Sequence, residues 1–84
     1  VRARGAMPTV LKTGGYRFFF FSLEGNEPPH VHVERGDDAA KFWLSPVQLV
    51  ESHGFRAHEL NRVRAMVIEH RLEFQEAWNA HFGH

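Results

Sequence analysis

The sequence predicts an α+β domain: an antiparallel sheet of four or five strands, built from β-hairpins, with one long C-terminal helix packed across one face. Three observations support this class. Segments of alternating or continuous apolar residues fill the first half of the chain. Glycine-containing segments at residues 14–15 and 36–38 separate them as tight turns. From Arg56 onward, apolar residues recur at spacings of three, four and seven, as in a helix.

The first predicted hairpin joins residues 8–12 to the aromatic run of residues 16–21. The four consecutive phenylalanines of that run are typical of a β-strand. A two-residue turn on the glycine pair places Lys12 opposite Arg17.

The second predicted hairpin pairs residues 30–35 with residues 39–44, and both segments alternate apolar and polar side chains. A polar loop at residues 24–29 precedes it, and its final proline pair stops any helix there. Residues 47–50 are either a fifth strand or a short helix, and we favour the strand.

An amphipathic helix of about seven turns is predicted from Arg56 to Gly83, where a glycine commonly ends a helix. His70 falls within the apolar stripe, where a bend or break could also occur. The stripe consists of Leu60, Val63, Val67, Phe74, Ala77 or Trp78, and Phe82.

The length of 84 residues suits one domain, which we place at residues 7–84 behind a short N-terminal extension at residues 1–6. A hydrophobic content of 43% argues against disorder. The absence of cysteine excludes disulfides and thiolate metal sites and fits a cytoplasmic location.

The balanced charge bears on the class of partner. Ten basic and ten acidic residues give a formal net charge of zero, whereas proteins that grip nucleic-acid backbones usually carry a basic excess. Any RNA contact must therefore come from a local patch. No apolar run approaches the roughly 20 residues that cross a bilayer, so we expect no membrane partner.

Strand periodicity assigns the histidines to one face of the sheet. If Val31 and Val33 face the helix, then His30, His32 and Glu34 face away from it. Only a one-residue slip of the strand register would reverse this assignment.

The aromatic run of residues 16–21 contributes phenylalanines to the same outer face, because its side chains alternate between the two faces of the sheet and one helix can cover only one face. An exposed apolar patch of this kind usually marks an interaction surface. The predicted binding surface consists of Arg17, Phe19, Phe21, Glu34, Lys41 and Trp43.

Two chemical interpretations of the histidines are open. Alternate strand residues can reach one metal ion, but His30 and His32 need a third ligand, either Glu34 or a residue from elsewhere. We therefore assign no metal and no cofactor. As a catalytic pair, His30 and His32 could act as acid and base beside Arg17 or Lys41, as metal-free RNA cleavage requires.

Two further interpretations need no chemistry. Aromatic and basic side chains on a sheet can stack bases and meet phosphates, but the same residue types also form protein–protein interfaces. The zero net charge favours a protein partner or self-association. Alternatively, a folded loop or a second subunit covers this face, and the histidines have no role beyond the fold.

Several segments between Met7 and the C-terminal helix resemble the bacterial domain of unknown function 4160 family. The most specific is Glu27-Pro28-Pro29-His30-Val31-His32-Val33. The others are Met7-Pro8-Thr9-Val10, Gly15-Tyr16-Arg17-Phe18-Phe19-Phe20, Ala40-Lys41-Phe42-Trp43-Leu44, Gly54-Phe55 and Glu59-Leu60.

The resemblance implies no settled activity. Genes of this family often sit beside another small gene, in an arrangement that resembles a toxin–antitoxin pair, which implies a partner-bound regulator or an RNA-directed toxin. The resemblance points to His30 and His32, with Lys41 and Trp43 beside them. In one departure, Arg56 replaces the usual Ser or Thr before the helix, so we expect no reciprocal capping box with Glu59.

The leading hypothesis is therefore a small protein-interaction module, one component of a bacterial toxin–antitoxin-like pair, that uses the outer sheet face. The alternative is an RNA-binding or RNA-cleaving toxin that uses His30 and His32.

Overall fold

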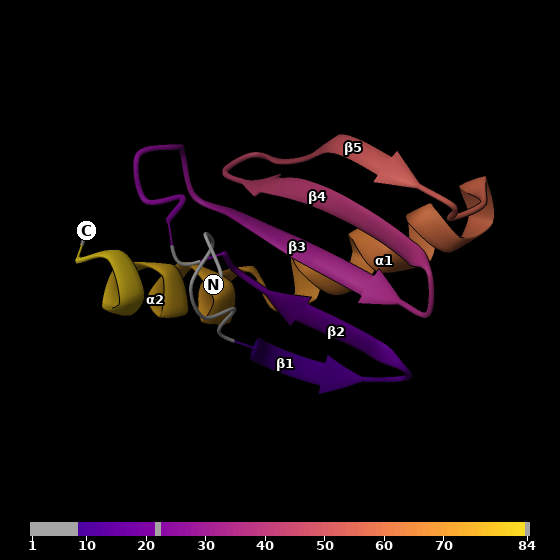
Figure 1. The fold of residues 1–84 in the computed structure, drawn as a ribbon, viewed down its shortest axis with the longest axis horizontal. Coiled ribbons are helices and arrows are strands. Elements are labelled where there is room, and N and C mark those ends of the chain that lie inside the picture. Colours follow the sequence, from indigo (N-terminus) through magenta and orange to yellow (C-terminus); the bar gives the residue numbers. More distant parts are fainter. Residues whose placement is uncertain (1–8, 22, 84) are drawn as a thin grey trace.

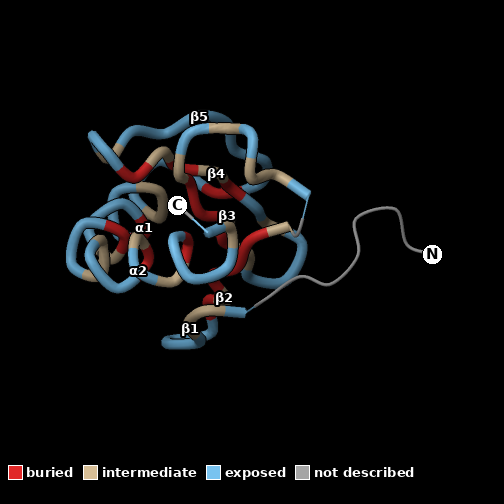
Figure 2. The backbone as a smooth tube through the Cα atoms, turned by 90° about the vertical axis from the view of Figure 1, so that its left-hand side faces the viewer, coloured by how far each residue is buried: buried red, intermediate tan, exposed pale blue. Residues whose placement is uncertain are grey.

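The computed structural model describes residues 9–21 and 23–83, so the expected extension at residues 1–6 lies outside the described residues. Five strands form one antiparallel sheet in the order β1-β2-β3-β4-β5. Two helices follow and lie on one side of the sheet (Figures 1 and 2). The elements are β1 Thr9–Thr13, β2 Tyr16–Phe19, β3 His30–Arg35, β4 Asp38–Leu44, β5 Val47–His53, α1 Ala57–Glu69 and α2 Arg71–Phe82.

Strand pairing confirms the predicted hairpins. Lys12 lies opposite Arg17 in the first hairpin, across the glycine turn. In the second hairpin His30 pairs with Trp43 and His32 pairs with Lys41. Residues 47–50 belong to the favoured fifth strand, which is longer than predicted and pairs with β4.

The hydrophobic core lies between the sheet and the two helices. Val31 and Val33 of β3 are completely buried on the helix-facing side, as the alternation predicted. From the helices, the core receives Val63, Val67, Phe74 and Trp78, all with no exposed surface. Phe18 of β2 packs on Phe74 with 5.2 Å between ring centroids.

The expectation of one long helix is wrong. The helical residues divide at His70, whose backbone (φ −103°, ψ 16°) leaves the helical region, so α1 ends at Glu69 and α2 begins at Arg71. The hydrogen bond from the Phe74 N–H to the His70 carbonyl, at 2.9 Å, ties α2 to the break. The apolar stripe continues through it, which is why periodicity alone predicted a single helix.

The start of α1 is better capped than the sequence predicted. The Arg56 N–H donates to Glu59 Oε1 at 2.9 Å, which forms the Glu59 half of a capping box. The reciprocal half is missing, since Arg56 makes no side-chain capping hydrogen bond. In the described part of the chain, no helix is both long enough and apolar enough to cross a membrane.

Candidate functional site

The loop between β2 and β3 folds over the end of the sheet and brings Glu24 to the histidines. Two backbone hydrogen bonds shape this loop: Glu24 N–H to the Phe21 carbonyl at 3.3 Å, and Glu27 N–H to the Glu24 carbonyl at 3.1 Å. Gly25 lies so close to α2 that an added Cβ would stand 2.6 Å from the Phe82 ring. A side chain at position 25 would therefore push the loop away from α2.

His30, the first residue of β3, is completely buried although it was predicted to face outward. The reason is its place at the sheet end, where the loop and α2 close over it. Its ring contacts the Trp78 ring, with 4.9 Å between centroids, and the Trp43 ring at 5.8 Å. Its Nδ1 lies 3.0 Å from the Pro28 carbonyl and its Nε2 lies 2.8 Å from Glu24 Oε1.

His32 lies two residues further along β3 on the outer face, with 13% of its side chain exposed. Its Nε2 lies 2.8 Å from the same Glu24 Oε1. The imidazole stacks on Phe19 and meets the edge of Phe21, at centroid distances of 5.4 Å and 4.6 Å. Burial lowers the pKa of His32, and the hydrogen bond to Glu24 only partly opposes this effect.

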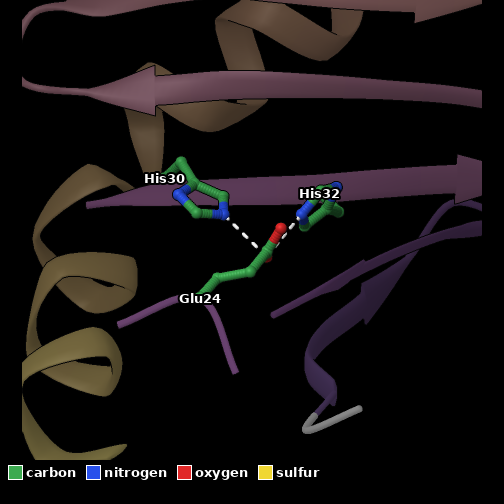
Figure 3. A group of neighbouring side chains, drawn as sticks. All are labelled: Glu24, His30 and His32. Atoms are coloured by element: carbon green, nitrogen blue, oxygen red, sulfur yellow. Dashed lines mark hydrogen bonds and ion pairs between the residues drawn. The ribbon is translucent and has the colours of Figure 1, made fainter. Parts of the chain in front are cut away.

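Glu24 is the group that joins the two imidazoles (Figure 3). Partial burial by itself raises the pKa of Glu24, but its contacts with the imidazoles of His30 and His32 together hold that pKa below its usual range. The carboxylate is therefore ionised at neutral pH. Among the described residues, Glu24, His30 and His32 offer three ligand atoms that all lie within 4.8 Å of one another.

The ion pair between Lys41 and Glu27 lies next to this cluster. Lys41 Nζ lies 2.7 Å from Glu27 Oε1 and 5.0 Å from the Trp43 ring centroid. The same Glu27 oxygen lies 3.8 Å from His30 Nδ1. The Lys41 ammonium is thus already paired with a carboxylate, which reduces the positive field it exerts on the cluster.

Glu34, considered above as a third metal ligand, lies apart from the cluster. Its Oε1 receives hydrogen bonds from Arg17 Nε at 3.0 Å and from Arg17 Nη2 at 2.8 Å. The Arg17 guanidinium also covers the Phe19 ring at 4.1 Å. Phe19 is consequently only 5% exposed, so the expected exposed aromatic patch is smaller than predicted.

A groove of about 340 Å³ runs across the outer face beside the cluster. Glu24 and His32 border it together with Phe19, Phe21, Val33, Glu34, Ala39, Ala40, Lys41 and Glu51. A neighbouring hollow of about 280 Å³ shares His32 and Glu51 and continues toward His53. The ionisable groups along the groove are mainly carboxylates, with Lys41 and His32 as the basic members.

The structure therefore brings together most of the residues selected from the sequence, and adds one. His30 and His32 share one carboxylate, and Lys41 and Trp43 lie next to them. Sequence reasoning missed Glu24, which comes from the loop and has no periodic relation to the strand. The only signal was a glutamate in the polar loop before the proline pair, and such glutamates are common.

A family model for a domain of unknown function, DUF4160, matches residues 15–79. This segment includes the histidine strand, the Glu24 loop and most of both helices. No curated protein and no solved structure matches the chain. Because the match covers most of the sequence, the chain belongs to the DUF4160 family of domains of unknown function.

Proposed function

We propose that the protein is a small protein-interaction module, one component of a bacterial toxin–antitoxin-like pair, which contacts its partner through the outer face of the sheet. The observation that carries this proposal is the groove of about 340 Å³ on that face. The rings of Phe19 and Phe21 border it, and Glu24, Glu34 and Glu51 contribute carboxylates. A protein segment that presents an apolar side chain beside Lys or Arg would complement both features.

The electrostatics favour protein over RNA. Three carboxylates along the groove repel phosphate groups, and the two nearest cations are already paired, Arg17 with Glu34 and Lys41 with Glu27. The formal net charge of zero supplies no compensating long-range attraction.

The RNA-cleaving alternative receives less support from the geometry. An acid–base pair must reach the reacting atoms of its substrate, but His30 has no exposed surface. His32 alone of the two borders the groove. Growth arrest on expression, relieved by His32→Ala in a folded protein, would restore the RNA alternative.

Co-purification with the product of the adjacent gene tests the proposed interaction. Glu51→Lys should greatly reduce the yield of the complex, because it reverses a charge on the groove without disturbing the core. Trp43→Ala should also reduce it, since the indole lies next to Lys41 on the same face. Phe19 is a poorer choice, because its burial would confound lost binding with lost stability.

Glu76→Lys is the matched control. Glu76 is exposed on α2, on the helical side of the molecule, and its reversal changes the net charge by the same amount. The proposal predicts a normal yield for Glu76→Lys and a loss for Glu51→Lys. Equal yields for the wild type, Glu51→Lys and Trp43→Ala would refute the outer face as the contact surface.

A further inference from the structure

We infer that Glu24, His30 and His32 form a binding site for a divalent transition-metal ion of the zinc type. The inference goes beyond the proposed interaction and does not depend on it. It rests on the donor set, on the orientation of the buried imidazole and on the access that the groove provides.

The donor set suits such an ion. Two imidazole nitrogens and one carboxylate oxygen converge from two segments, the strand β3 and the loop before it. Imidazole suits Zn²⁺, Ni²⁺, Cu²⁺ and Fe²⁺, whereas Mg²⁺ and Ca²⁺ prefer sites made entirely of oxygen. Three protein ligands with a fourth position open to solvent is also the usual arrangement of catalytic or exchangeable zinc.

The orientation of His30 points to a cation between its Nε2 and Glu24. A carbonyl oxygen can only accept, so the Pro28 carbonyl at 3.0 Å requires that Nδ1 carries a proton. In the neutral ring this leaves a lone pair on Nε2, directed at the carboxylate oxygen 2.8 Å away. Two lone pairs do not attract each other, so either a second proton or a metal ion must lie between them.

A metal ion suits the surroundings of His30 well. Metal-binding histidines almost always donate their other ring N–H to a carbonyl or carboxylate, which fixes the tautomer and the ring orientation. The Pro28 carbonyl supplies this contact, and the consecutive prolines fix the backbone that carries it. Packing against the Trp78 ring also holds the imidazole in place.

Adjustment of all three side chains separates the hydrogen-bonded arrangement from a coordinated one. Tetrahedral zinc with ligand distances of about 2.0–2.1 Å separates its ligand atoms by about 3.3 Å. The two imidazole–carboxylate distances are 2.8 Å and the three ligand atoms lie within 4.8 Å of one another, so the Glu24 oxygen must withdraw by about half an ångström and the two imidazole nitrogens must come to about 3.3 Å from each other. Glu24 lies in a loop, so its side chain can adjust, and the imidazoles of His30 and His32 must turn on β3 to close the remaining separation.

The groove provides access and an open coordination position. Both Glu24 and His32 border it, so an ion held between them is within reach of solvent and of any ligand in the groove. His30 closes the opposite side, where no surface is exposed. A donor atom of the partner, or a water molecule, can therefore complete the coordination of the metal.

Titration with Zn²⁺ tests the inference, using protein without a polyhistidine tag that has been freed of metal with a chelator. Calorimetry should show one strong site per chain for the wild type. Glu24→Gln keeps the shape of the side chain but loses its charge. Because loss of a second-shell contact alone typically costs about 10–100-fold in metal affinity, Glu24→Gln and His32→Ala should each weaken zinc binding at least about tenfold.

Two matched variants control for zinc bound elsewhere. Glu34→Gln removes the carboxylate that borders the same groove but pairs with Arg17. His53→Ala removes an exposed imidazole of β5 that lines the neighbouring hollow. Both should bind zinc with wild-type affinity. Unfolding curves of every variant in chelator show whether it still folds without metal. The same curves with zinc then show whether it has lost the metal site.

The outcomes are distinct. Zinc that raises the unfolding temperature of the wild type but not of Glu24→Gln, when both are folded without metal, supports the inference. Wild-type affinity in both Glu24→Gln and His32→Ala would place the ion elsewhere and overturn it. A wild type with no stoichiometric zinc binding would also overturn it, and would leave the cluster as a carboxylate shared by two histidines. Neither result affects the co-purification test above.

Discussion

The pair of substitutions Glu24→Ala and Glu24→Gln distinguishes the hydrogen bonds of the cluster from its charge. In the wild type, one oxygen of Glu24 meets both imidazoles at 2.8 Å. Alanine removes both contacts. Glutamine can keep one of them, because the position that meets both imidazoles can hold either the amide oxygen, which accepts from a protonated Nε2, or the amide nitrogen, which donates to a lone pair.

The expected magnitude follows from the burial of each partner. A hydrogen bond to a charged group contributes about 1.5–3 kcal/mol. His30 has no exposed surface, whereas His32 borders the groove, so the loss of Glu24 costs more at His30 Nε2 than at His32. We therefore expect Glu24→Ala to lower the free energy of unfolding by about 2–4 kcal/mol and Glu24→Gln, which keeps one contact, by about 1–2 kcal/mol.

Urea denaturation of the metal-free protein in chelator, followed by circular dichroism, measures the two free energies of unfolding. For a domain of 84 residues, the loss in Glu24→Ala corresponds to a fall of on the order of 10–20 °C in the unfolding temperature. Glu76→Ala on the exposed side of α2 should change little and serves as the control. Equal losses in Glu24→Ala and Glu24→Gln would show that the charge, not the hydrogen bonds, holds the cluster together. No loss in Glu24→Ala would refute the geometry itself.

Three other predictions concern acidification and two packing contacts. In the folded protein the pKa of His32 is lowered from 6.5 and that of Glu24 from 4.5, so the unfolded chain binds more protons on acidification. The metal-free protein should therefore lose stability as the pH falls below about 6.5, and again below about 4.5. Unfolding curves across this pH range check the prediction. Glu24→Gln should weaken the dependence of stability on pH below about 4.5, and a stability that rises on acidification would contradict the prediction. Gly25→Ala should reduce both stability and zinc affinity, because its Cβ would stand 2.6 Å from the Phe82 ring and displace the loop. Wild-type values in both the unfolding curve and the zinc titration would count against this. Trp78→Ala should cost about 3–5 kcal/mol in urea denaturation, since the indole is completely buried, and a cost below about 1 kcal/mol would contradict the packing described for α2.

The sheet was the most predictable part of the fold. Alternation on β3 correctly identified the buried Val31 and Val33, because a period of two assigns each side chain to a face before any partner is known. The glycine turn at residues 14–15 correctly predicted the pairing of Lys12 with Arg17, since turn length determines hairpin register. These are local rules, and they depend only on residues near one another in the sequence.

The cluster could be predicted only in part, because its third member has no local signature. Periodicity located His32 but could not show that the loop and α2 bury His30. Glu34 satisfied the strand pattern as a third ligand, but Arg17 on the neighbouring strand occupies it. Glu24 reaches the histidines because Gly25 lets the loop approach Phe82, a contact between segments far apart in the sequence.

The helix break had a similar origin. His70 lies within the apolar stripe, so the pattern itself continues through it, and the sequence showed only that a bend was possible there. The break also bears on the cluster, since α2 carries the Trp78 whose ring contacts His30.

A crystal structure of the zinc-loaded protein, with anomalous scattering recorded at the zinc edge, tests the role of the Glu24–His30–His32 cluster most directly. We predict one strong anomalous peak among His30 Nε2, His32 Nε2 and a Glu24 oxygen, each at about 2.0–2.2 Å, with a further position open toward the groove. A peak at other residues, or no peak while the three side chains keep their hydrogen bonds, would contradict the account.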